Sequence, residues 1–213
     1  MIYKIRSLKF NPFMLFFFAL LFSFFPSNQV KAVEPVILCF GDSLTAGWGV
    51  SEKENYPTLL QQKLRENGFP HKVVNAGISG DTTASGLNRV KWSLRTNPSL
   101  VILVLGANDG LRGLPPNVIK ENMNKIINIF KEKKISIVLG GMKIPPNYGI
   151  TSSKKFELVF HELAAQHKTP FIPFFLEGVA GHPELNQGDG IHPNAAGYKI
   201  ISENVWRILY PLL

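Results

Sequence analysis

The sequence of 213 residues has a single cysteine, Cys39, so no internal disulfide can form and a hydrophobic core must hold the fold together. Cys39 lies in an apolar segment with no histidine beside it, and we expect a buried, unreactive thiol. The sequence has no HExxH motif and no paired Cys/His ligands, so it gives no support for a metal centre. The net charge is +8, but residues 1–32 contribute half of it. The other Lys and Arg residues are scattered, which disfavours a nucleic-acid partner.

No internal repeat, low-complexity tract or linker divides the chain, and no apolar run reaches the roughly 20 residues of a membrane-spanning helix. The apolar run at residues 13–25 follows a basic start and precedes the small-residue sequence Val30-Lys31-Ala32. This order is typical of a secretory signal peptide. We therefore expect residues 1–32 to be removed and residues 33–213 to form one periplasmic or secreted domain. An uncleaved membrane anchor is the alternative.

Five short runs rich in Val, Ile, Leu and Phe indicate strands covered on both faces, because their apolar residues are continuous rather than alternating. Segments with helical periodicity lie between these runs. This alternation predicts an α/β fold, a three-layer α/β/α sandwich around a five-stranded parallel sheet. The predicted strands are residues 36–40, 72–75, 100–105, 135–139 and 171–174. The predicted helices are residues 56–66, 83–96, about 117–133, 152–166 and a last helix containing Ile201, Val205 and Ile208.

Polar segments follow three of the predicted strands and precede the last helix. FGDSLTAG ends the first strand, NAGISGD the second and GANDG the third, and DGIHPN comes before the last helix. Right-handed crossovers bring the carboxyl ends of parallel strands to one edge of the sheet, where ligands of such sheets bind. We therefore expect these four segments to converge on one site.

Ser43 is the predicted nucleophile of an acyl-transfer site, because it follows a strand and has glycines nearby that permit a tight turn. The alternative is a helix N-cap, a common role for serine after a strand. Asp189 and His192 favour the nucleophile, since their spacing of three lets the carboxylate orient an imidazole that deprotonates the serine. We expect Pro193 to open the last helix and to fix this pair at its N-terminal end.

Gly77 and Asn108 follow two other predicted strands. An unobstructed glycine N–H and an asparagine amide can both donate to an oxyanion, and we expect them to do so at this site. Their alternative roles are a turn glycine and an Asx turn.

The segments FGDSLTAG, NAGISGD, GAND and DGIHPNAAGY resemble, in this order, the four sequence blocks of the SGNH/GDSL hydrolase family. The likeness covers residues 36–210 and is greatest to the branch of acyl-CoA thioesterase I, lysophospholipase L1 and bacterial arylesterases. It implies a flavodoxin-like sandwich and a serine hydrolase without a cofactor. It also assigns Ser43 as nucleophile, Asp189 and His192 as the remaining triad, and Gly77 and Asn108 as oxyanion donors with the Ser43 backbone N–H.

The resemblance implies small-molecule substrates: aryl esters, acyl thioesters or lysophospholipids. The apolar segment 142–150 is predicted to line the acyl groove through Met142, Ile144, Pro145 and Tyr148. We expect a monomer that uses no metal and whose contact with membrane lipid is transient.

Three alternatives stay open at this point. The first is a carbohydrate O-deacetylase on the same fold. The second is a lipid- or glycan-binding module that has lost turnover. The third is a metal-dependent phosphohydrolase that uses Asp42, Asp189 and His192, although these ligands are scattered along the chain.

Overall fold

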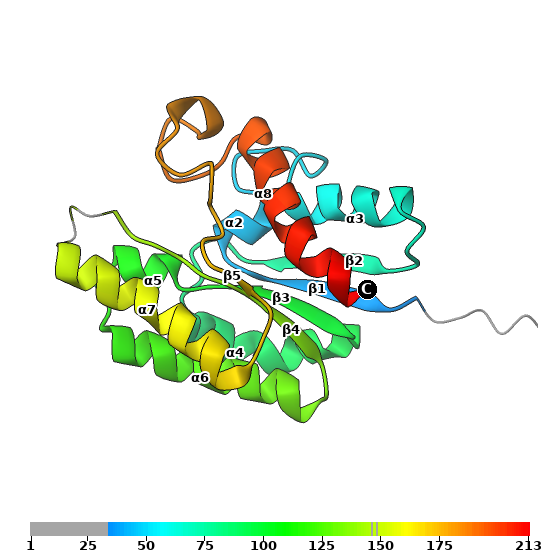
Figure 1. Ribbon diagram of the computed structural model, residues 1–213, viewed down its shortest axis with the longest axis horizontal. Helices are drawn as coiled ribbons and strands as arrows, with labels where there is room; N and C mark the ends of the chain where they lie inside the picture. Colours follow the sequence, from blue (N-terminus) through cyan, green and yellow to red (C-terminus); the bar gives the residue numbers. More distant parts are fainter. Residues whose placement is uncertain (1–33, 146, 148) are drawn as a thin grey trace, which may run out of the picture. The chain divides into compact units, whose positions relative to one another are not determined.

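The computed structural model describes residues 34–145, 147 and 149–213 (Figure 1). The predicted signal peptide, residues 1–32, and Tyr148 lie outside the described residues. The strands are Val36–Gly41 (β1), Lys72–Gly77 (β2), Leu100–Val104 (β3), Ser136–Gly140 (β4) and Phe171–Ile172 (β5). The α-helices are Ser43–Ala46 (α2), Tyr56–Glu66 (α3), Thr83–Ser93 (α4), Ala107–Leu111 (α5), Pro116–Glu132 (α6), Ile150–His167 (α7) and Ala195–Leu209 (α8). Short 3₁₀ helices are Leu94–Thr96 (η2), Pro183–Leu185 (η4) and Tyr210–Leu212 (η5).

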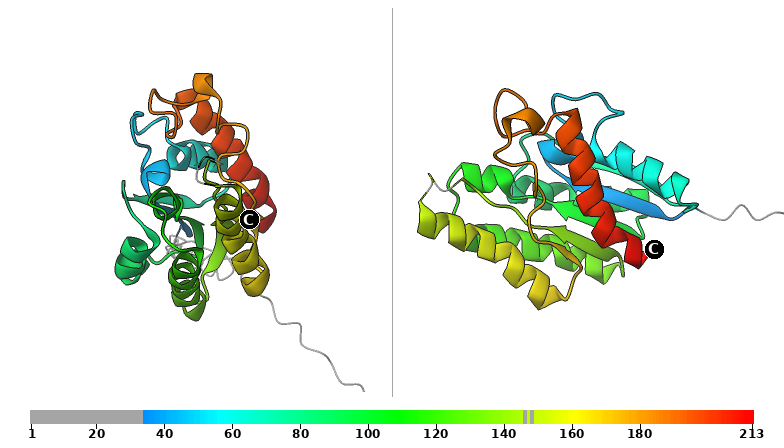
Figure 2. Two further views of the ribbon diagram at one scale, coloured as in Figure 1. Left: turned by 90° about the vertical axis from the view of Figure 1, so that its left-hand side faces the viewer. Right: turned by 45° about the horizontal axis from the view of Figure 1, so that its top comes forward.

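The five strands form one parallel sheet in the order β2-β1-β3-β4-β5. Helices α3 and α8 pack together on one face, and α4, α6 and α7 cover the other (Figures 1 and 2). The predicted three-layer sandwich is therefore confirmed. The chain leaves β1 toward one edge of the sheet and β3 toward the other, so the carboxyl ends of these two strands border a topological switch point, where ligands bind in open α/β sheets.

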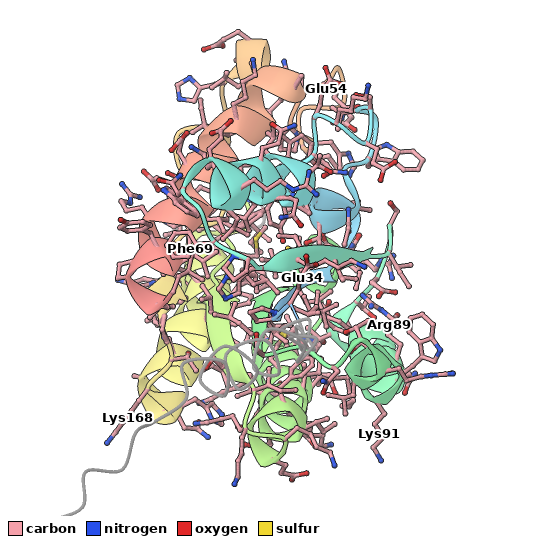
Figure 3. The ribbon with its side chains drawn as sticks, turned by 90° about the vertical axis from the view of Figure 1, so that its right-hand side faces the viewer. Glu34, Glu54, Phe69, Arg89, Lys91 and Lys168 are labelled. Atoms are coloured by element: carbon pink, nitrogen blue, oxygen red, sulfur yellow. The ribbon has the colours of Figure 1, made fainter. Side chains whose placement is uncertain are left out.

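The central strands and the apolar helix stripes form the core. Every residue of β3 is buried, and so are the four residues of the α6 stripe. That stripe is spaced by four, three and four residues, which keeps it on one side of a helix. The stripe residues are Ile119, Met123, Ile126 and Phe130. On the other face of the sheet, the Phe69 ring packs edge-on against Trp206 of α8 and Tyr210 of η5 (Figure 3).

The start of α8 differs from the prediction. The helix begins at Ala195 rather than at Pro193, because the Asn194 side chain caps it by accepting two backbone N–H groups of the first turn at 2.9 and 3.1 Å. Pro193 instead pairs with Asn186 in an isolated antiparallel bridge. The bridge closes the loop that precedes α8 and gives it a defined shape.

Two other elements differ from the sequence expectation. Strand β5 ends at Ile172 instead of residue 174, since Pro173 has no N–H to continue the ladder. Helix α5 was not predicted, because five residues are too few to give a periodic pattern. No helix among the described residues has both the length and the apolar character needed to cross a bilayer.

Candidate active site

Ser43 is the first residue of α2, immediately after β1. Asp42 caps this helix, and its Oδ1 accepts the Leu44 N–H at 3.0 Å. The N-cap interpretation of Ser43 is therefore wrong, and its hydroxyl does not serve to hold the helix. The turn before it requires a glycine, because a Cβ at Gly41 would come within 2.1 Å of the Thr45 hydroxyl oxygen. This tight turn leaves the Ser43 side chain at the carboxyl edge of the sheet.

The hydroxyl, imidazole and carboxylate lie in a continuous hydrogen-bonded line. His192 Nε2 is 2.9 Å from Ser43 Oγ, although the two residues are 149 positions apart. His192 Nδ1 is 2.6 Å from Asp189 Oδ2. Because the proton on Nδ1 is donated to the carboxylate, the lone pair of Nε2 is available to accept the Ser43 proton. The geometry is that of an activated nucleophile.

The Asp189 carboxylate is held in its ionised form. Desolvation raises its pKa, but hydrogen bonds from the His192 side chain and from the backbone outweigh this effect and lower the pKa to about 2. The backbone donors are the N–H groups of Ile191 and His192, each 3.0 Å from Oδ1. A permanent negative charge therefore faces the imidazole and can stabilise the imidazolium that forms during proton transfer.

Asp42 is a second, buried carboxyl group next to the nucleophile. It is 1% exposed, and its Oδ2 has no hydrogen-bond partner within the described residues. Burial, reinforced by the charges of Asp81 and Asp109, raises its pKa to about 7 against the opposing hydrogen bond from Leu44. In the part of the chain that the structure describes, no three His, Cys, Asp or Glu side chains are grouped to hold a metal ion. The ligand set of the phosphohydrolase alternative is therefore not assembled.

Asn108 and Gly80 each carry an amide group with an N–H that, among the described residues, is free for a ligand. Asn108 lies in α5 and borders the same cavity as Ser43. One of its Nδ2 hydrogens is donated to the Asp81 carbonyl at 2.9 Å, so the other is free for substrate. Gly80, which precedes Asp81, has a φ of +84° and is exposed, and its N–H donates no hydrogen bond within the described residues.

Arg89 on α4 forms hydrogen bonds both to the loop after β2 and to the end of β1 (Figure 3). Its Nε donates to the Asp81 carboxylate at 2.5 Å, and a terminal nitrogen donates to the Gly41 carbonyl at 2.9 Å. The guanidinium also stacks over the Phe40 ring, 3.9 Å from the ring centroid. The loop that carries Gly80 is therefore fixed relative to β1, the strand that precedes Ser43.

Gly77, the predicted backbone donor to the oxyanion, has no free N–H in the structure. Its N–H is already donated to Asn75 Oδ1 at 2.9 Å. A Cβ at this position would lie 2.1 Å from the Ala46 nitrogen. Gly77 thus permits close packing of β2 against α2, and its expected role as an oxyanion donor does not fit the structure.

A cavity of about 480 Å³ opens beside the nucleophile, and Ser43, Asn108 and His192 are among the residues that line it. Three of the four residues predicted to line an acyl groove border it, and the fourth, Tyr148, lies outside the described residues. The walls are mostly apolar, as a hydrocarbon chain requires. They include Leu111, Met142, Ile144, Pro145, Phe174 and Ile191.

Comparison with known proteins agrees with this geometry. The model of the GDSL-like Lipase/Acylhydrolase family matches residues 39–200, a range that includes Ser43, Asn108 and His192. The chain belongs to this family. The match covers most of the described domain, so members of the family can be compared with it residue by residue.

Relatives within the GDSL-like family carry esterase and thioesterase names. The chain is 41% identical over 184 residues to "Esterase TesA" of Pseudomonas aeruginosa, covering 86% of this chain and 92% of the relative. It is 39% identical over 183 residues to "Arylesterase" of Vibrio mimicus, covering 85% and 92%. It is 36% identical over 183 residues to "Thioesterase 1/protease 1/lysophospholipase L1" of Escherichia coli, covering 85% and 86%. The crystal structure of TesA superposes with a TM-score of 0.81 at 42% identity, covering 84% of this chain and 99% of that one.

Three residues near the GDSL-family site were not found by sequence reasoning. Gly80 lies three positions after Gly77 in the same motif, and the two differ in their backbone conformation and in whether the N–H is already donated. Gln187 and Trp48 border the catalytic loops through contacts between distant segments. Their positions have no local sequence signal.

Proposed function

We propose that the chain is a serine esterase and thioesterase that hydrolyses small acyl esters through an acyl-enzyme on Ser43. The observation that carries this proposal is the line of hydrogen bonds from Ser43 Oγ through His192 to Asp189. Family membership and the names of the relatives support the same reaction class. No cofactor is needed, because nucleophile, base and oxyanion donors are all side chains or backbone amides of this chain.

In the first half-reaction His192 Nε2 takes the Ser43 proton while Oγ attacks the substrate carbonyl carbon. The tetrahedral intermediate then collapses, and His192 returns the proton to the departing alcohol or thiol. In the second half-reaction His192 deprotonates water, which attacks the acyl-enzyme and releases the acid and the free Ser43 hydroxyl. Asp189 holds the imidazole in the required tautomer and remains charged throughout.

The oxyanion is stabilised by the Ser43 backbone N–H, the Gly80 backbone N–H and Asn108 Nδ2. Each of these groups retains a hydrogen without a partner among the described residues. Ser43 N–H is also at the N-terminus of α2, where helix amides point toward developing negative charge. Gly80 takes the role that the sequence motif suggested for Gly77.

The apolar cavity favours acyl chains over sugars, and for this reason we prefer aryl esters, acyl thioesters and lysophospholipids to carbohydrate acetates as substrates. The test is a series of nitrophenyl esters from acetyl to dodecanoyl, with kcat/KM measured for each. We expect kcat/KM to rise with chain length until the cavity is filled. A strict preference for acetyl would overturn this assignment in favour of the O-deacetylase.

The decisive test of the reaction is Ser43→Ala, assayed with a nitrophenyl ester and with a fluorophosphonate probe. We expect turnover to fall by at least about 10³-fold and the covalent adduct to be lost. Ser51→Ala, at an exposed serine whose side chain donates to Glu54, is the matched control and should keep both signals. Undiminished turnover in Ser43→Ala would exclude the acyl-enzyme.

The proposal includes export of a monomeric domain, with residues 1–32 as a cleaved signal peptide. It rests on the basic start, the short apolar run and the small-residue site at Ala32. The intact mass of the protein recovered from the periplasm should correspond to residues 33–213, and its sedimentation should fit a single copy. Recovery of the full-length chain in the membrane fraction would favour an uncleaved anchor.

A further inference from the structure

Trp48 is a large apolar side chain that is exposed although its backbone is firmly held. Its side chain is 55% exposed. The backbone N–H of Trp48 donates to the Ser43 carbonyl at 3.1 Å, and the backbone carbonyl of Trp48 accepts from Gln187 Nε2 at 2.6 Å. An aromatic ring on a fixed backbone loses little conformational freedom when it makes a new contact, which makes it an efficient binding surface.

Gln187 connects the Trp48 loop to the histidine loop. Besides its bond to Trp48, its Nε2 donates to the Pro193 carbonyl at 3.0 Å, and its backbone N–H donates to the His192 carbonyl at 2.8 Å. The two loops approach closely at Gly49, where a Cβ would come within 2.0 Å of the Gln187 side-chain oxygen. Trp48 is therefore fixed to the loops of both the nucleophile and the base.

The indole of Trp48 lies beside the base but outside the acyl cavity. The ring centroids of Trp48 and His192 are 6.3 Å apart, with the planes tilted by 45°. His192 borders the cavity, whereas Trp48 does not. The indole is therefore a neighbour of the base that does not line the apolar cavity.

The reaction determines what must lie on that side. The leaving-group oxygen receives its proton from His192 Nε2, so it has to be within hydrogen-bond reach of that atom when the intermediate collapses. The acyl chain occupies the apolar cavity, and the rest of the alcohol must therefore extend past His192 toward solvent. Trp48 is an exposed aromatic residue next to His192, so we expect the alcohol to pass its indole.

We propose that Trp48 forms a leaving-group subsite that selects esters of aromatic alcohols by stacking against the indole. This inference rests on the proposed function of Ser43 and His192 and adds the alcohol side of the substrate to it. Aromatic pairs prefer offset or tilted arrangements and gain affinity beyond simple area burial, by an amount that corresponds to roughly 3- to 10-fold in binding. A saturated ring of similar size can bury apolar area against the indole, but it has no π-system and lacks the additional affinity of an aromatic pair.

The test compares benzyl, cyclohexylmethyl and ethyl esters of the same acid, because their alkyl leaving groups differ little in intrinsic reactivity. We expect the wild-type kcat/KM to be greatest for the benzyl ester. In Trp48→Ala the benzyl-to-cyclohexylmethyl ratio should fall by roughly 3- to 10-fold, and Trp48→Phe should retain most of it. The matched control is Trp92→Ala, which removes another exposed tryptophan, 66% exposed on α4, and should leave the ratio unchanged.

Three results would overturn the subsite. The first is an unchanged kcat/KM for all three esters in Trp48→Ala. The second is an equal loss for the benzyl and cyclohexylmethyl esters, which would indicate general apolar contact. The third is a loss seen only with lysophospholipid in phosphatidylcholine vesicles, which would make Trp48 a membrane contact. Failure of the proposed function itself gives a different result, since Ser43→Ala would then still hydrolyse all three esters. Thermal unfolding of Trp48→Ala should match wild type, because the lost side chain is exposed.

Discussion

Asp189 contacts His192 twice, with one carboxylate oxygen on the ring and the other on the backbone N–H. Both the tautomer and the position of the imidazole therefore depend on this single side chain. In Asp189→Asn we expect kcat to fall on the order of 10³- to 10⁴-fold, because a carboxamide neither fixes the tautomer nor stabilises the imidazolium. Glu184→Gln, at an exposed acid of the same loop, is the control and should stay near wild type.

The pKa of about 2 for Asp189 determines the pH range over which this loss of kcat is expected. A carboxyl group with a depressed pKa stays ionised above it, so the wild-type carboxylate is charged throughout pH 4–9. Asp189 should therefore contribute to kcat throughout that range, and the wild-type kcat should exceed that of Asp189→Asn at every pH of a steady-state profile. A ratio that approaches one at pH 4–5 would mean that Asp189 is protonated there.

Asn108→Ala tests the side-chain donor of the oxyanion site. Loss of one such donor typically reduces kcat by about 10²- to 10³-fold, and KM should change little because the donor acts mainly on the transition state. Asn75→Ala is the comparison, since Asn75 supports the loop after β2 without bordering the cavity. A rise in KM at constant kcat would show that Asn108 binds the ground state instead.

Gly77→Ala tests the packing role that replaces the predicted catalytic one. The new Cβ would lie 2.1 Å from the Ala46 nitrogen, and backbone atoms must move to relieve the clash. We expect the free energy of unfolding in urea to fall by about 1–3 kcal/mol. Gly188→Ala is the matched control, because nothing lies within 4 Å of its added Cβ. Wild-type stability of Gly77→Ala would contradict the close approach of β2 and α2.

Asp42→Asn tests the buried carboxyl beneath the nucleophile. Its pKa of about 7 in the folded protein exceeds the value of about 4 in an unfolded chain, so the folded state binds the extra proton between these values. Its contribution to stability is therefore greatest below pH 4, declines as pH rises to 7 and is constant above that. The asparagine variant keeps the capping oxygen but has no such decline.

The measurement is urea unfolding of wild type and Asp42→Asn at pH 4 and pH 8. The stability of the variant relative to wild type should rise between these values, by up to about 4 kcal/mol. Comparing the two proteins cancels the contributions of His71 and His167, whose pKa values are lowered by burial in both. Parallel pH profiles would show that Asp42 ionises normally.

The fold was predictable because its signals are local. Continuous apolar runs identified the strands, and the spacing of residues such as Ile119 and Met123 identified a helix face. The predicted nucleophile, base and acid come together because parallel strands end at a common edge, which is a property of the topology. Helix ends were less predictable, since the Asn194 cap and the Pro193 bridge depend on individual hydrogen bonds.

The donor side of the site could not be read in detail from sequence. Gly77 and Gly80 belong to one motif, and they differ in whether the backbone N–H is already occupied. That difference depends on the Asn75 side chain and on a left-handed φ, neither of which has a sequence pattern. The contact between Gln187 and Trp48 spans 139 residues, and only the folded arrangement of the loops reveals it.

The separation of 149 residues between Ser43 and His192 has a consequence for the timing of activity. A chain emerging from the ribosome has its serine exposed long before the imidazole is synthesised. Without that partner the hydroxyl is an ordinary, weakly reactive alcohol. The enzyme is therefore latent during its synthesis, until the loop before α8 docks and brings His192 to Ser43.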